Sequence, residues 1–89
     1  MSDRIVRFLD GEGRIKIWPS KINMKNEVLT YLADKFESGR IYSEKEVNRT
    51  INAWHTFNDY FLLRRGLIDA KLLSRTINGS SYWKEERRE

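Results

Sequence analysis

Apolar residues recur every three or four positions in the segment after Pro19, which is the spacing of one face of a helix. The pattern predicts a helix over residues 23–39, with Asn23 as its N-terminal cap and Gly39 where a C-terminal cap belongs. The predicted buried face carries Val28, Leu29, Leu32 and Phe36. The opposite face is acidic and would be turned to solvent, with Glu27, Asp34 and Glu37.

A second helix is predicted to begin within residues 42–47, Tyr-Ser-Glu-Lys-Glu-Val. Ser43 is a preferred N-cap residue, and Glu46 lies three positions later, which is the spacing of a capping box. Each of these side chains would satisfy a backbone N–H near the other, so Glu46 is expected to be structural rather than catalytic. The predicted buried stripe is Val47, Ile51 and Trp54. The outward side carries Lys45, Arg49, Asn52 and Thr56.

The third predicted helix covers residues 57–70 and contains two adjacent arginines, Arg64 and Arg65. Its apolar residues gather on one side: Phe57, Tyr60, Phe61, Leu63, Leu67 and Ile68. Because successive helical residues rotate by about 100°, Arg64 falls inside this apolar side and Arg65 falls outside it. An unpaired buried arginine costs several kcal/mol. We therefore expect Arg64 to stabilise the fold through a carboxylate or a backbone carbonyl, with Glu46 as a candidate partner.

Arg65 is the better candidate for an intermolecular contact, but two aspartates, Asp59 and Asp69, share its face of the helix. DNA phosphates would repel both carboxylates, so this helix is not expected to read the major groove. Leu62 lies on the same face and is predicted to be exposed, as a candidate contact for a partner protein or a second subunit. A single exposed leucine is also common without any function.

Two segments have the pattern of β-structure. Ile15 and Ile17 alternate with a lysine, which predicts a strand over residues 14–18; residues 4–9 are compatible with either a strand or a helix. Near the C-terminus, Asn78-Gly79 separates two strand-like runs and predicts a hairpin with a type I′ turn. That pairing sets Arg75 beside Tyr82 and Ser74 beside Trp83.

The order of these elements predicts a single α+β domain over residues 1–84. An N-terminal strand or short hairpin, three helices and a C-terminal β-hairpin are the order of a winged-helix-like fold. Residues 85–89 alternate in charge without an apolar residue and are predicted to be a frayed tail.

Composition narrows the classes of function. The 89 residues have a net charge of +4 and no cysteine, so disulfides and thiolate metal sites are excluded. The single histidine, His55, is expected in a polar surface loop rather than in a metal site. No glycine-rich phosphate loop or nucleophile–base pair is present, so neither an enzyme nor a cofactor is predicted. With no membrane span and no signal-peptide core in the sequence, a cytoplasmic protein is expected.

Three ordered blocks of sequence carry a family resemblance: Ile-Tyr-Ser-Glu-Lys-Glu-Val-Asn at 41–48, Asp-Tyr-Phe-Leu-Leu-Arg-Arg-Gly-Leu-Ile-Asp at 59–69, and Leu-Leu-Ser-Arg at 72–75 followed by Asn-Gly-Ser-Ser-Tyr-Trp at 78–83. The chain resembles the bacterial family called domain of unknown function 2087. Members occur alone or fused to helix-turn-helix transcriptional regulators. The resemblance implies a place in bacterial transcription control and assigns no role to an individual residue.

Three functional hypotheses follow. The first is a transcription-associated module that binds DNA mainly through phosphates, with candidate contacts at Lys45, Arg49, Arg65, Arg75 and Lys84. The second is an interaction or dimerisation module that binds a protein partner, or its own copy, and does not bind DNA. The third is a sensor that binds an anionic effector through Arg64.

Overall fold

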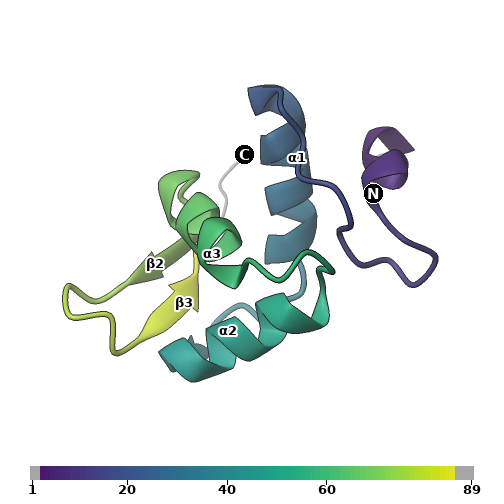
Figure 1. Ribbon diagram of the computed structural model, residues 1–89. Coiled ribbons are helices and arrows are strands. Elements are labelled where there is room, and N and C mark those ends of the chain that lie inside the picture. The colour runs from purple at the N-terminus through teal and green to yellow at the C-terminus, as the bar shows by residue number, and fades with distance from the viewer. Residues whose placement is uncertain (1–2, 86–89) are drawn as a thin grey trace.

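The computed structural model describes residues 3–85 and confirms the α+β class. In this part of the chain a short 3-10 helix precedes three α-helices and three short strands (Figure 1). In chain order these are η1 (Asp3–Phe8), α1 (Ile22–Ala33), β1 (Ile41–Tyr42), α2 (Glu44–Ala53), α3 (Tyr60–Asp69), β2 (Leu73–Arg75) and β3 (Tyr82–Lys84).

The three strands form one antiparallel sheet in the order β1-β3-β2. The predicted hairpin register is confirmed, because Ser74 pairs with Trp83 and Arg75 with Tyr82. The predicted type I′ turn is wrong, since Gly79 has φ 73° but Asn78 is not in the left-handed region. The loop over residues 76–81 is wider than two residues, and the Thr76 hydroxyl accepts N–H groups from its far side.

The predicted N-terminal strand over residues 14–18 is absent. Residues 3–8 form η1, and Ile15 makes only isolated bridges to Leu9 and His55. The Ile15 N–H donates to the Trp54 carbonyl at 2.8 Å, so this segment is held by the loop after α2 rather than by a sheet. Ile15 is completely buried whereas Ile17 is exposed, so core packing accounts for Ile15 alone.

Two helix boundaries differ from prediction. Asn23 does not cap α1, because the helix begins one residue before it, and Gly39 lies well beyond its end at Ala33. Helix α3 begins at Tyr60, later than predicted, because Asn58 has φ 58° and Asp59 is the N-cap residue. The Asp59 carboxylate accepts the Leu62 N–H at 3.2 Å.

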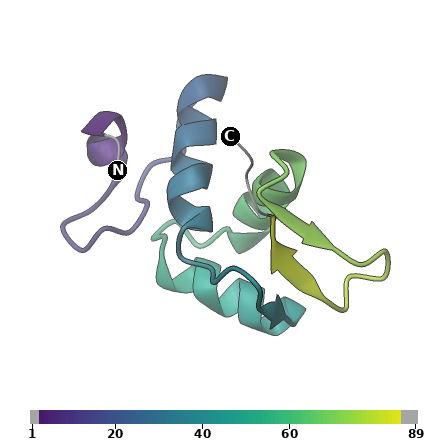
Figure 2. The ribbon, with the colours of Figure 1, turned by 180° about the vertical axis from the view of Figure 1, so that it is seen from behind.

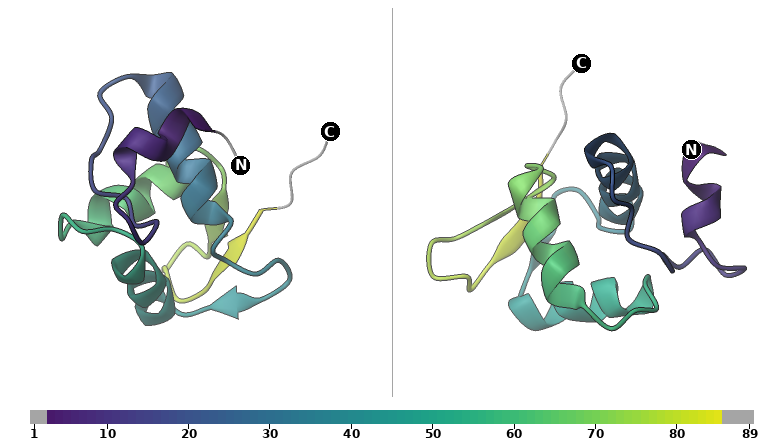
Figure 3. Two further views of the ribbon diagram at one scale, coloured as in Figure 1. Left: turned by 90° about the vertical axis from the view of Figure 1, so that its right-hand side faces the viewer. Right: turned by 45° about the horizontal axis from the view of Figure 1, so that its top comes forward.

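The helices and the sheet enclose one core. Its completely buried side chains come from the N-terminal loop and all three helices: Ile15, Val28, Leu32, Val47, Ile51, Leu63 and Leu67. Helix α1 stands between the N-terminal segment on one side and α3 with the hairpin on the other (Figures 1 and 2). The right view of Figure 3 shows the same arrangement, and in the left view the N-terminal helix overlaps α1. Within residues 3–85, no helix is long and apolar enough to cross a bilayer.

The last described residue, Glu85, departs from the predicted frayed tail. Its N–H donates to the Leu72 carbonyl at 3.0 Å, and its carboxylate accepts a hydrogen bond from the Ser74 hydroxyl. Residues 86–89 of the predicted tail lie outside the described residues.

Candidate functional site

Arg64 joins α3 to the first turns of α2. Its Nη1 donates to Asn48 Oδ1 at 2.7 Å and to Glu44 Oε2 at 3.2 Å, and only 15% of its side chain is exposed. The predicted partner of Arg64, Glu46, is wrong, because the Glu46 carboxylate pairs with Arg40 at 3.3 Å instead. Glu44 and Asn48 are one helical turn apart, so both can reach the same guanidinium.

The start of α2 contains a capping box. The Ser43 hydroxyl accepts the Glu46 N–H at 3.1 Å, and the Glu46 carboxylate accepts the Ser43 N–H at 2.8 Å. The Ser43 N–H holds the pKa of the Glu46 carboxyl below its ordinary value, and the charge of Arg40 lowers it further. The box places the α2 N-terminus, and with it Glu44, beside Arg64.

A polar groove of about 510 Å³ lies between α3 and the β2–β3 hairpin. Three arginines, Arg64, Arg65 and Arg75, line it together with two carboxylates, Glu44 and Asp69. We call it the arginine groove. Positive charge therefore exceeds negative charge along its walls, and two of the arginines come from α3 while the third comes from the hairpin.

The hydroxyl of Tyr82 is an unused polar group in this groove. The residue is only 4% exposed, lines the groove and makes no side-chain hydrogen bond with any described residue. A Cβ added at Gly79 would lie 3.8 Å from both this hydroxyl and Arg75 Nη1. Gly79 itself has φ 73°, a left-handed conformation that favours glycine, and it carries the hairpin loop past these two donors.

The guanidinium groups of Arg65 and Arg75 are less occupied by partners than that of Arg64. Arg65 has 71% of its side chain exposed and lies 3.8 Å from Asp69, a loose surface pair. Arg75 donates to the Thr76 and Ile77 carbonyls of the hairpin loop, each at 3.1 Å, through Nη1 alone. Both guanidinium groups keep further donors for an anion.

The remaining predicted cations lie in two places. Lys45 and Arg49 are exposed on α2 and form no ion pair within residues 3–85, on the flank next to the Glu44–Asn48 face. Lys84 lies outside the arginine groove. Its Nζ is 3.8 Å from the Asp34 carboxylate and 3.5 Å from the Phe36 carbonyl, with 22% of the side chain exposed. Lys84 therefore ties β3 to the chain after α1.

His55 is buried, contrary to the prediction of a polar surface loop. Its Nδ1 lies 2.7 Å from the Ile51 carbonyl, and its Nε2 accepts the Asp59 N–H at 2.9 Å. The ring bridges the end of α2 and the start of α3. Among the described residues no cluster of carboxylates, cysteines or histidines suits a metal ion.

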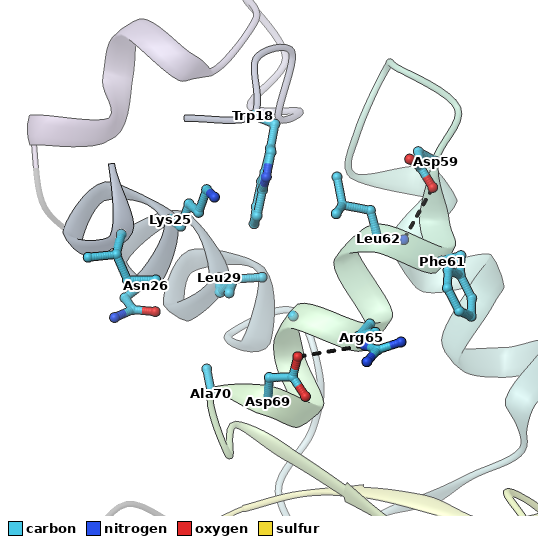
Figure 4. A pocket seen from close by; sticks show the side chains of 12 residues that line it. Trp18, Lys25, Asn26, Leu29, Asp59, Phe61, Leu62, Arg65, Asp69 and Ala70 are labelled. Atoms are coloured by element: carbon cyan, nitrogen blue, oxygen red, sulfur yellow. Dashed lines mark hydrogen bonds and ion pairs between the residues drawn. The ribbon is translucent and has the colours of Figure 1, made fainter. Parts of the chain in front are cut away.

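A second groove, of about 510 Å³, lies between α1 and α3 (Figure 4). We call it the apolar groove, because its walls include Trp18, Ile22, Leu29, Leu62 and Ala70. Leu62 was predicted to be exposed, but it is half-buried, since its side chain turns along α3 toward Trp18 (Figure 4). Arg65 lines both grooves.

Comparison with known families assigns the chain to one of them. The family model described as an uncharacterized protein conserved in bacteria (DUF2087) matches residues 14–84. The chain belongs to this family. No curated protein and no solved structure matches the chain. The matched range of the DUF2087 domain includes every groove residue named above.

Several groove residues of this DUF2087 domain were not predicted. Trp18 and Lys25 had no local signal, because the groove they line exists only after α1 packs beside α3. The partners of Arg64 could have been predicted, because the sequence places an acidic residue and an amide residue one turn apart on α2. No local sequence pattern indicated that the Tyr82 hydroxyl would lie in the arginine groove.

Proposed function

We propose that this protein is a transcription-associated module that binds nucleic acid, with duplex DNA held mainly through its phosphates. The observation that carries the proposal is the convergence of Arg64, Arg65 and Arg75 in one groove beside an unpartnered tyrosine hydroxyl. Arginine guanidinium groups match phosphate oxygens in geometry and charge. A net charge of +4 adds long-range attraction.

The arrangement of elements supports the same proposal. The order is a helix, a strand, two helices and a hairpin, and the last strand pairs with the first. This order is expected of a winged-helix-like domain. In such a domain the hairpin lies beside the third helix, so one duplex could contact both. Arg65 would reach phosphate from the helix and Arg75 from the hairpin.

The aspartates of α3 are weaker obstacles than their formal charges suggest. Asp59 is occupied as the cap of α3, and Asp69 already lies beside Arg65. Arg64 is held by α2, so its role in the proposal is to position α3 and to raise the local potential. Lys45 and Arg49 add two exposed cations on α2. Lys84, being tied to Asp34, is not included.

The test is fluorescence anisotropy with a labelled duplex over a series of salt concentrations. Affinity should fall steeply with salt, and Arg65→Gln and Arg75→Gln should each reduce the log–log slope by about 0.9. Arg7→Gln is the matched control, because it removes the same charge from η1, which lies across α1 from the hairpin (Figure 1). Absence of binding at low salt, or equal loss in the control, would reject the proposal.

A second candidate function is a protein-interaction or dimerisation module. It is favoured by exposed apolar side chains beside the apolar groove, with Phe61 55% and Ile22 70% exposed. Sedimentation equilibrium over a range of concentrations tests it. A monomer at every concentration would reject self-association.

A further inference from the structure

The apolar groove has the size and walls of a small-molecule site. Its volume of about 510 Å³ lies within the range of about 300–1,000 Å³ that is usual for ligand pockets. In Figure 4 the Trp18 ring hangs between α1 and α3, with Leu29 of α1 below its free edge and Leu62 of α3 beside it. A flat apolar body could lie against the indole ring and between these two leucines.

Gly66 gives the groove a closed floor. A Cβ at this position would lie 3.1 Å from a methyl carbon of Leu29, so α3 approaches the α1 side chains closely here. Leu29 is buried, and the backbone of α3 lies directly against it. Packed groups at Gly66 and Leu29 therefore form the floor of the groove, which is otherwise open to solvent.

The charges around the groove leave one cation unmatched. The Asp59 carboxylate accepts the Leu62 N–H, and Asp69 lies 3.8 Å from Arg65. Lys25 forms no ion pair with any residue that the structure describes, and its Nζ lies 5.7 Å from the centroid of the Trp18 ring. A positive charge thus stands next to the flat apolar wall without a carboxylate of its own.

We infer that the apolar groove binds a small organic acid with a flat apolar body. The body packs against Trp18, Leu29 and Leu62, and the carboxylate pairs with the Lys25 ammonium. The inference goes beyond nucleic-acid binding and does not depend on it. A neutral molecule of the same shape would lack the ion pair with Lys25. A larger partner could bind without contacting the floor of the groove.

The experiment is an NMR titration of the free protein with 2-naphthoate and, as a neutral match, 2-naphthamide. The Trp18 indole N–H and the methyl signals of Leu29 and Leu62 should shift and saturate with 2-naphthoate. The amide should bind about fivefold more weakly, as expected for a partly exposed ion pair. Lys25→Met should abolish that difference. Lys21→Met, which removes an exposed lysine outside the groove, should retain it.

Three results of the titration would overturn the inference. They are no saturable shift at millimolar probe, equal affinity for the acid and the amide, and loss of preference in the Lys21 variant as well. Groove shifts that appear on concentrating the protein alone would assign the groove to a second copy and would also overturn it. Because no DNA is present, failure here leaves the salt-dependence test unaffected, and failure of DNA binding leaves this titration unaffected.

Discussion

The two sides of α3 differ in how their grooves are built. On the hairpin side, charged residues from α2, α3 and the β2–β3 hairpin face one another, and one buried arginine is held by two partners. On the α1 side, a tryptophan and two leucines form much of the walls, and two cations and two carboxylates, Lys25, Arg65, Asp59 and Asp69, also line the groove. Phe61, Arg65 and Asp69 line both grooves.

The difference shows that adjacent residues of one helix can serve separate purposes. Arg64 and Arg65 are consecutive, yet one is mostly buried and bonded to α2 whereas the other is mostly exposed. The rotation of about 100° between successive residues is enough to separate them. Both grooves therefore use α3 as a wall. A substitution in α3 can alter both grooves or only one, depending on the direction in which its side chain points.

The largest loss of stability is expected from a buried residue of α3, because α3 forms a wall of both grooves. Leu67 is completely buried on the inner side of α3, and Leu67→Ala should cost about 2–5 kcal/mol of unfolding free energy. Urea denaturation measures this, and NMR signals of both grooves should be lost together. Leu62→Ala, in the half-buried wall of one groove, is the comparison and should cost less. An equal cost for both variants would show that α3 is not anchored through Leu67.

An intermediate effect should separate the two arginines. Arg64→Met removes the donor shared by Glu44 and Asn48 and should cost about 1–2 kcal/mol. Arg65→Met removes only a loose surface pair, so its effect should stay within about 0.5 kcal/mol. Thermal unfolding of the two variants under identical conditions measures the contrast. The distinction between a structural and a free arginine fails if their stabilities match.

The smallest effect is expected from the charge of Glu46, through the start of α2. Its folded pKa is below the ordinary value of 4.5, so the ionised carboxylate stabilises the fold at neutral pH. This contribution is lost as pH falls through the lowered folded pKa. The stability gap between the wild type and Glu46→Gln should thus be widest near pH 7 and close in acid. Thermal melts from pH 7 to pH 3 measure it.

Glu37→Gln is the control for that series. It removes another carboxylate near Arg40 but breaks no hydrogen bond to the α2 N-terminus. A gap that persists unchanged into acid would mean that the charge of Glu46 does not stabilise the capping box. Signals around Arg64 should respond to Glu46→Gln, and those of Trp18 should not, because α2 does not line the apolar groove.

Much of the fold was predictable where the signal was local. The start of α2 depends on hydrogen bonds within four residues, and the register of the hairpin follows from a turn between two short runs. The strand predicted at residues 14–18 failed because Ile15 is buried by the loop after α2. His55 was misplaced for the same reason, since its neighbours Ile51 and Asp59 enclose it only once α2 and α3 are both placed.

Four features could be read from the sequence alone: the α+β class, the DUF2087 family, the capping box, and the separation of Arg64 from Arg65. The first two depend on the order of elements and motifs along the chain, and the last two on residues within one or two helical turns. Only the tertiary structure decided the partners of Arg64, the burial of His55 and the two grooves. These depend on how α1, α2 and the hairpin pack around α3, and packing joins residues that no local pattern relates.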